Sequence, residues 1–267
     1  MTRFPARDGI NLLAAAANEL NGVRTAVLLG ENTLVDIPTA GFGGINNLTG
    51  GAIYTSLTPT AMEIVSTAAT DTAPAGTGAR VVEVDMLDAN WKEVTHQLEM
   101  DGVTPVAIPG GTYLRCNSIR LITAGGNAPD GRITVDTDPG GVEVCAVDID
   151  QGISKSGMFT VPDKHGCLII GMSVAIRTGG NSYAAWQLFE RSQLDGEPVR
   201  RHRLYGVNSR PNATTGAGGV HTLDIVPNIP LYVKGPADLW MAGNSDTAVI
   251  PFTRVQARTD LLLIRET

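Results

Sequence analysis

Hydrophobic and polar residues alternate along much of the chain after its first 60 residues. In residues 82–86 apolar side chains alternate with acidic ones, and residues 93–100 alternate in a similar way. A period of two places one set on a buried sheet face and the other in water, so both stretches predict β-strands. Asp101 and Gly102 follow directly, and both residue types tolerate a positive φ. They predict a hairpin with the next apolar run, residues 103–108.

The alternating pattern continues towards the C-terminus. A second Asp-Gly pair, Asp195-Gly196, lies between two strand patterns and predicts another hairpin. One strand is expected to bury a single face made of Leu168, Ile170, Met172, Val174 and Ile176. Further strands are predicted at residues 113–123, 132–137, 142–149, 184–192, 198–207, 223–226, 230–233, 239–242 and 252–264. Many short strands predict an all-β chain of one or two β-sandwich, jelly-roll-like modules, with a boundary near residue 150.

The first 60 residues have a different pattern and predict an N-terminal extension. Residues 11–22 predict a short helix, with Asn11 as its cap and Gly22 at its end. We predict that residues 1–60 form an assembly arm, residues 61–150 a first β-module and residues 151–267 a second. The alternative is a strap packed on its own subunit. The apolar anchors of the arm would be Leu12, Leu13, Leu20, Phe42 and Ile45.

The composition agrees with an all-β chain and disfavours some classes of function. Of 267 residues, 31 are Gly and 15 are Pro, and only 18% are charged, so turn formers are abundant and helix-forming charged residues are few. The formal net charge of −7 disfavours binding to a phosphate backbone. We expect no membrane span and no signal peptide, because long apolar runs are missing. Cys116, Cys145 and Cys167 are expected to be buried, reduced thiols.

The motifs that carry catalysis or metal binding are missing or incomplete. Residues 76–78 begin like a dinucleotide loop, but Val81 stands where the third glycine belongs, so a turn between strands is the better interpretation. His96 is expected to be a hydrogen-bonded core or interface residue. The acidic pairs in residues 136–138 and 148–150 are interpreted as loop carboxylates. We therefore predict no catalytic residue, no cofactor and no metal site.

One dense basic cluster stands out in this acidic chain. Arg200, Arg201 and Arg203 surround His202, and Arg191 lies nearby in the sequence. One interpretation is an edge strand that charge protects from pairing with other chains. The other is an electrostatic contact with an acidic neighbouring subunit. The sequence does not separate the two, and all four arginines are interface candidates.

Several segments occur in a characteristic order and spacing. They are Met62–Thr67, Asp71–Val84, Leu87–Trp91, Asp101–Val106, Tyr113–Arg115, Ile122–Gly126, Gly131–Val135, Thr160–Gly166 and Gln187–Arg191. Together they resemble virion structural proteins of tailed bacteriophages, especially of marine phages. The resemblance covers roughly residues 60–265 and leaves the N-terminal extension outside.

The resemblance implies a non-enzymatic component of a phage particle, at the head surface as decoration, in the neck or in a tail ring. Its partners would be other copies of itself and other virion proteins of the capsid, portal, neck or tail. The chain would be made in the host cytoplasm and would bind neither membrane nor specific nucleic acid sequences. The alternative is a carbohydrate- or receptor-binding β-sandwich module of a phage tail or head fibre. A virion-associated hydrolase is a third hypothesis, which the missing motifs disfavour.

Overall fold

The protein is all-β among its described residues, which confirms this part of the predicted fold. The computed structural model describes residues 22–32, 43–126, 128–139, 141–178, 184–192, 201–209, 219–227, 230–245 and 254–266. All strand pairs in this part of the chain are antiparallel, and its one helix is a short 3-10 turn, Thr49–Gly51. The helix predicted at residues 11–22 lies outside the described residues, apart from Gly22.

Two sheets with a shared core form the first unit, which we call the N-module. One sheet has the order β6 (Val106–Ala107), β3 (Met62–Ser66), β8 (Ile133–Thr137) and β9 (Glu143–Val147). The other has the order β5 (Glu93–Glu99), β4 (Ala79–Asp88) and β7 (Tyr113–Ala124). The predicted alternation is confirmed on β4, where Val82, Val84 and Met86 are buried in the core. Both sheets therefore bury their apolar faces against one another.

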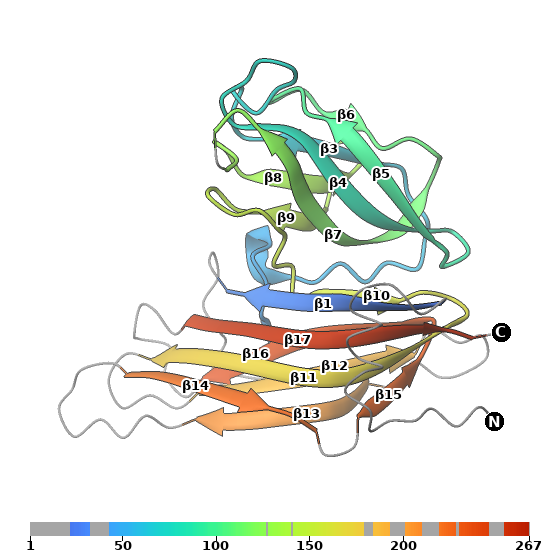
Figure 1. Cartoon of the computed structure of the whole chain (residues 1–267), viewed down its shortest axis with the longest axis vertical. Helices are drawn as coiled ribbons and strands as arrows, with labels where there is room; N and C mark the ends of the chain where they lie inside the picture. Colours follow the sequence, from blue (N-terminus) through green and yellow to red (C-terminus); the bar gives the residue numbers. More distant parts are fainter. Residues whose placement is uncertain are drawn as a thin grey trace.

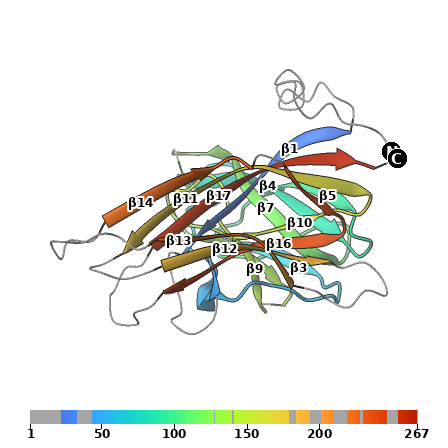
Figure 2. The ribbon, with the colours of Figure 1, turned by 90° about the horizontal axis from the view of Figure 1, so that it is seen from below.

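Two five-stranded sheets form the second unit, the C-module. One has the order β1 (Val23–Glu31), β17 (Arg254–Arg265), β11 (His165–Thr178) and β14 (Gly219–Ile225), with β15 (Leu231–Lys234) also paired to β11. The other has the order β10 (Met158–Val161), β16 (Ala237–Ser245), β12 (Ala184–Ser192) and β13 (Arg201–Ser209), with β2 (Gly43–Gly44) paired to β16. Figure 2 shows the two layers, β14, β11 and β17 over β13, β12 and β16. Their shared core contains the buried Trp186.

The N-module stands on the C-module, and residues near 50 lie between them (Figure 1). The first module ends with β9 at Val147 and the second resumes with β10 at Met158. The strands thus change from one pair of sheets to the other between Val147 and Met158.

Part of the predicted N-terminal arm belongs to the C-module. β1 pairs with β17 along its whole length, from Val23 opposite Ile264 to Glu31 opposite Gln256. Ile45, expected as an anchor on a neighbouring subunit, is fully buried in the core of its own chain. Leu28 and Ile45 of the first 60 residues thus lie in the core of a module formed mostly from residues after 150, which agrees with the alternative of a strap packed on its own subunit for this part of the segment. Leu12, Leu13, Leu20 and Phe42 lie outside the described residues.

The first predicted hairpin is wrong, although the turn itself is present. Gly102 has the expected positive φ of 60°. However, β5 pairs with β4 and β6 pairs with β3, so the two strands lie in different sheets. The backbone of Gly102 bonds instead to Ser66 and Asp71, which carries the chain across the core from one sheet to the other. The second predicted hairpin is confirmed as the pairing of β12 with β13.

A bulge changes which side chains of β11 face the core. The register against β17 shifts between Ile169 and Gly171. An extra residue reverses the alternation from that point. The core side chains before the bulge are therefore Cys167 and Ile169, whereas Leu168 and Ile170 were predicted there. After the bulge, the predicted residues Met172, Val174 and Ile176 do face the core.

Candidate functional site

The most unusual polar arrangement lies where the two modules meet, and we call it the joint. Arg115 lies on β7, where successive side chains point to opposite faces. Cys116 packs into the core of the N-module, so Arg115 points away from that core towards the C-module. On β16, Leu239 faces the C-module core and its neighbour Asp238 faces the other way. The alternation of the two strands thus places a guanidinium and a carboxylate opposite each other.

Arg115 and Asp238 form a two-point ion pair that is almost completely buried. Nε of Arg115 donates to Oδ1 of Asp238 at 3.1 Å, and Nη2 donates to Oδ2 at 3.0 Å. The two side chains are 0% and 1% exposed. A carboxylate and a guanidinium match in this geometry, and each compensates the other's loss of water. The pair joins residues 123 positions apart in the sequence.

Further hydrogen bonds saturate the carboxylate of the joint. Thr160 donates its hydroxyl to Oδ1 of Asp238 at 2.7 Å, and Nη2 of Arg191 lies 3.1 Å from Oδ2. Asn117 on β7 and Thr160 on β10 also exchange two hydrogen bonds, of 2.9 Å and 2.8 Å. With four donor contacts and almost no exposure, Asp238 is not placed to act as a general base or as a metal ligand.

Aromatic rings surround the Arg115 side chain. Its guanidinium carbon lies 5.4 Å from the centroid of the Trp91 ring and 5.9 Å from that of Tyr54. These are cation–π distances, which are favourable when the cation is shielded from water. The Trp91 carbonyl accepts a hydrogen bond from the backbone of Asp163, which is a further direct link between the modules.

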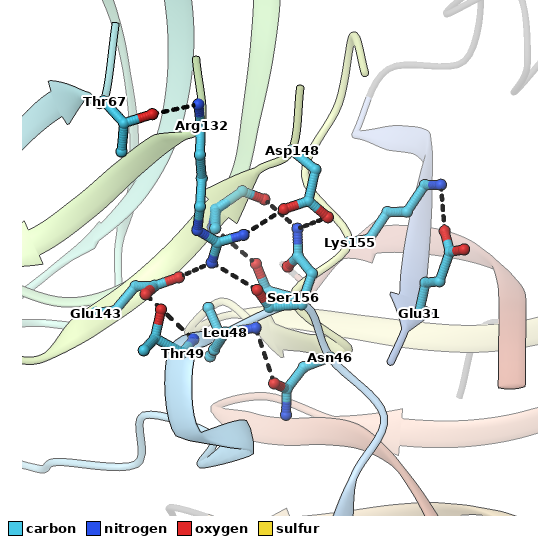
Figure 3. Close-up of polar contacts among 12 residues, drawn as sticks. Glu31, Asn46, Leu48, Thr49, Thr67, Arg132, Glu143, Asp148, Lys155 and Ser156 are labelled. Carbon is cyan, nitrogen blue, oxygen red and sulfur yellow. Dashed lines mark hydrogen bonds and ion pairs between the residues drawn. The ribbon is translucent and has the colours of Figure 1, made fainter. Parts of the chain in front are cut away.

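A second polar cluster links the modules through residues 43–51, which we call the strap (Figure 3). On one side, Ile45 of the strap bonds through its backbone N–H to Met241 in the C-module. On the other side, Arg132 of the N-module donates to the Asn47 carbonyl at 2.5 Å. The same guanidinium contacts Glu143 and Asp148. The strap is thereby held by both modules at once.

The arginines predicted as interface residues lie in different environments. Arg191 contacts Asp238 and donates to the Thr55 carbonyl at 3.0 Å, so it belongs to the joint within its own chain. Its predicted contact with another subunit stays a prediction. Arg201 and Arg203 lie on β13, opposite Arg191 and Phe189 respectively in the register with β12. Within the described residues, β13 is the last strand of its sheet. Arg200 lies outside the described residues.

The glycine-rich segment at residues 76–78 is a turn organised by a buried carboxylate. Asp71 is fully buried and accepts hydrogen bonds from the backbone of Ala79 at 2.6 Å and of Gly131 at 2.9 Å. It also accepts one from the Ser66 hydroxyl at 2.5 Å. These N–H groups are directed at a side chain of the same chain, which agrees with the turn interpretation and leaves them unavailable to a phosphate.

The expectations about the hydrogen bond of His96 and the burial of the three cysteines are met. His96 hydrogen-bonds through Nε2 to the Tyr113 hydroxyl at 2.9 Å. All three cysteines are buried and none forms a disulfide. Among the described residues, no three His, Cys, Asp or Glu side chains are grouped so that they could hold a metal ion. In the same part of the chain, no helix has the length and apolar character needed to cross a membrane.

The sequence reasoning missed both residues at the centre of the joint. In the sequence, Arg115 stands out only as the last residue of the segment Tyr113–Arg115, and no motif contains Asp238. The available signal was a charged residue inside a strand that is otherwise apolar, such as Asp238 between Ala237 and Leu239. A charge at such a position needs a partner, but its partner belongs to a different module and no local pattern identifies it.

Comparisons with known proteins found no matching family model and no matching curated protein. Solved structures of infectious bursal disease virus show a weak likeness. T=1 particles derived from that virus match with a TM-score of 0.24 and 11% identity, over 91% of this chain and 69% of that chain. Its VP2 subviral particle matches with a TM-score of 0.23 and 12% identity, over 92% and 73%. These neighbours are viral particle proteins, and scores this low carry no argument about the present chain.

Proposed function

We propose that the chain is a non-enzymatic structural subunit of a tailed-phage virion, in the head surface, the neck or a tail ring. The observation that carries this proposal is the joint. A subunit that repeats in a closed symmetric array must present its contact surfaces at fixed relative positions. The buried pair of Arg115 and Asp238 and the doubly held strap fix the two modules against each other. The sequence resemblance to tailed-phage virion proteins adds independent support.

In this proposal, neighbouring subunits contact one another through the edges of sheets and through oppositely charged surfaces. β13 ends its sheet among the described residues and contains Arg201 and Arg203. A basic edge on a chain of net charge −7 favours contact with an acidic surface of a neighbouring copy or of another virion protein. We further propose that each pair of sheets is a β-sandwich of jelly-roll type. The protein would be made in the bacterial cytoplasm and would work in the particle, without cofactor, membrane or specific nucleic acid.

A second candidate function is binding of a carbohydrate or receptor, and one observation favours it. Phe189 and Trp240 stack with ring centroids 5.3 Å apart. Trp240 also lines a cavity of about 220 Å³ together with Thr55 and Arg191. An aromatic ring beside polar groups is a common arrangement for ligand recognition. Glycan-array binding that Trp240→Ala abolishes, with the fold intact by circular dichroism, would favour this function.

Mass spectrometry of purified phage particles tests the main proposal. We expect peptides from this chain in mature, density-purified particles at a constant ratio to the major capsid protein. Their absence from particles, with the protein present in the infected-cell lysate, would contradict a virion role. The particles are treated with nuclease and washed in high salt before the measurement. This treatment removes proteins that adhere to the particle by charge alone.

A further inference from the structure

β5 is an edge strand of the N-module. It pairs with β4 on one side, and no other strand within the described residues pairs with it. Thr95, Gln97 and Glu99 are exposed along its length. A strand with one open side can accept a further strand from another chain, because its outer backbone groups are available for hydrogen bonds.

The hydrogen bonds to β4 show which backbone groups of β5 point outwards. At the two ends of the pair, the N–H of Met100 donates to the Arg80 carbonyl and the N–H of Asp88 donates to the Lys92 carbonyl, both at 2.9 Å. Bonded and non-bonded positions alternate in an antiparallel pair, so the even-numbered residues of β5 bond to β4. The odd-numbered residues of 93–99 therefore direct their N–H and C=O groups away from β4. Within the described part of the chain, these groups have no backbone partner.

The sheet face beside this edge is acidic. Glu93 and Glu99 lie at the two ends of β5, and Glu83 and Asp85 lie beside it on β4. Two guanidiniums, one from β7 and one from β1, contact these carboxylates, so a net negative charge remains. Pairing of β5 with β5 of a second copy is disfavoured, because full antiparallel overlap would place Glu93 opposite Glu99 at both ends. The edge instead suits a basic strand.

We propose that β5 of one copy accepts β13 of a second copy, so that a sheet continues from one subunit into the next. β13 is the last strand of its sheet among the described residues. It contains Arg201 and Arg203, which are two positions apart, the spacing of residues in one row along a strand. The pairing brings these arginines beside the acidic face of β5. This inference rests on the proposed function, because it names the acidic surface that the basic edge contacts.

The contact joins different copies because the two strands lie in different modules. β5 belongs to the upper module in Figure 1, and β13 lies at the bottom of the lower module. The buried pair of Arg115 and Asp238 holds the modules against each other, so one chain does not bring its own two edges together. Each copy thus offers β13 and accepts through β5. Such a head-to-tail contact closes into a ring or continues as a helical array.

A proline substitution tests the backbone part of the contact. The N–H of Thr95 points away from β4, so Thr95→Pro keeps the hydrogen bonds between β5 and β4 but removes a donor to an added strand. Thr95→Val is the matched control, because both variants lose the hydroxyl that donates to Asp85 at 2.8 Å. In sedimentation velocity over a concentration series, we expect oligomers of the full-length wild type and of Thr95→Val. Thr95→Pro should stay monomeric with an unchanged circular dichroism spectrum.

Charge reversal tests which strand is added. Arg201→Glu combined with Arg203→Glu should weaken association about tenfold or more, because like charges then face each other. Adding Gln97→Arg and Glu99→Arg to the same chain should restore association. Asp260→Arg, which reverses a charge on the central strand β17, is the control and should leave association unchanged.

Three results would overturn the proposal. They are a wild-type chain that stays monomeric throughout the series, oligomers that Thr95→Pro leaves intact, and association that survives reversal of both arginines. Particle analysis separates this inference from the proposed function. A chain found in mature particles without the edge contact overturns only the inference, whereas an intact contact in a chain absent from particles overturns only the virion role.

Discussion

The Arg115 guanidinium lies in one module and the Asp238 carboxylate in the other, yet they form a two-point ion pair with 0% and 1% side-chain exposure. Removing both charges from water has a cost comparable with their attraction, so the pair adds little net stability by itself. Leaving either charge without the other is much less favourable. The pair therefore acts mainly to specify one relative placement of the modules.

Asp238→Asn should destabilise the protein strongly. The variant removes the buried carboxylate that both Arg115 and Arg191 contact. We expect a loss of about 3–5 kcal/mol in the free energy of unfolding, measured by urea denaturation. Asp260→Asn is the matched control, because Asp260 pairs with Arg258 at the surface with 39% and 58% exposure. Exposed pairs of this kind contribute about 0–1 kcal/mol.

Replacing both partners of the ion pair tests whether the pair mainly sets the relative placement of the modules or mainly stabilises the protein. The double variant Arg115→Met with Asp238→Leu removes both buried charges. We expect it to lose clearly less stability than the sum of the two single changes, because each single change leaves one charge of the pair buried without the other and the double variant does not. Additive losses in the double-mutant cycle would show that the two side chains act independently, contrary to their direct contact.

Leu28→Ala tests whether β1 is part of the C-module core. Leu28 is 1% exposed and packs in that core, although it lies within the predicted N-terminal arm. We expect a loss of about 2–5 kcal/mol in the free energy of unfolding. Its neighbour Val27 points to the other face with 36% exposure, so Val27→Ala should cost much less. Equal, small effects of the two substitutions would mean that β1 is not packed on this core.

Asp71→Asn tests the carboxylate that organises the glycine-rich turn. An amide has only one oxygen, and its NH2 group would face the backbone donors of Ala79, Asp130 or Gly131. Loss of a buried, charge-assisted hydrogen bond costs about 1.5–3 kcal/mol, and we expect a loss of at least that size by thermal or urea unfolding. Asp130→Asn provides the comparison and should change stability little, because its carboxylate bonds to Thr77 in an exposed position.

The sequence predicted what depends on local pattern and missed what depends on contacts between distant segments. In residues 82–86, the alternation of apolar and acidic residues predicts which side chains are buried, and the structure buries those side chains in the core. The turn at Gly102 was also predictable, but its partner strands were not, because a turn between two sheets and a hairpin use the same residues. The bulge at Ile169 leaves no local signal, so the inward face of Leu168 was predicted wrongly.

The candidate site was less predictable than the fold. Of the residues in the joint, only Arg191 was among the predicted interface residues, and its observed partner is in its own chain. Arg115 and Asp238 could not be paired from sequence, since they lie 123 positions apart in different modules. A buried charge signals that a partner exists without identifying it.

Asp136→Asn should stabilise the protein at neutral pH. Burial raises the pKa of Asp136, and the nearby Glu143 and Glu63 raise it too, against the lowering effects of Thr134 and Arg132. The folded state thus holds the proton more tightly than the unfolded chain, so this residue favours folding at acid pH and disfavours it once ionised. The variant should therefore exceed wild type in stability near pH 7. The free energies of unfolding of the variant and the wild type should converge as the pH falls below the ordinary aspartate pKa. A constant difference at all pH values would contradict a raised pKa of Asp136.

The buried thiols should react slowly with a bulky reagent. Burial raises the pKa of Cys167 to about 12, so little thiolate is present at pH 8. We expect 5,5′-dithiobis(2-nitrobenzoic acid) to label all three cysteines rapidly in denaturant and only slowly in the native protein. Rapid labelling of the native chain would contradict their burial.

A symmetric reconstruction of the purified phage particle by electron cryomicroscopy tests the central claim most directly. The account predicts density for many copies of this chain at symmetry-related positions, each with the N-module and C-module in the arrangement set by Arg115 and Asp238. Density without this chain, or copies in which the two modules vary in relative orientation, would contradict it.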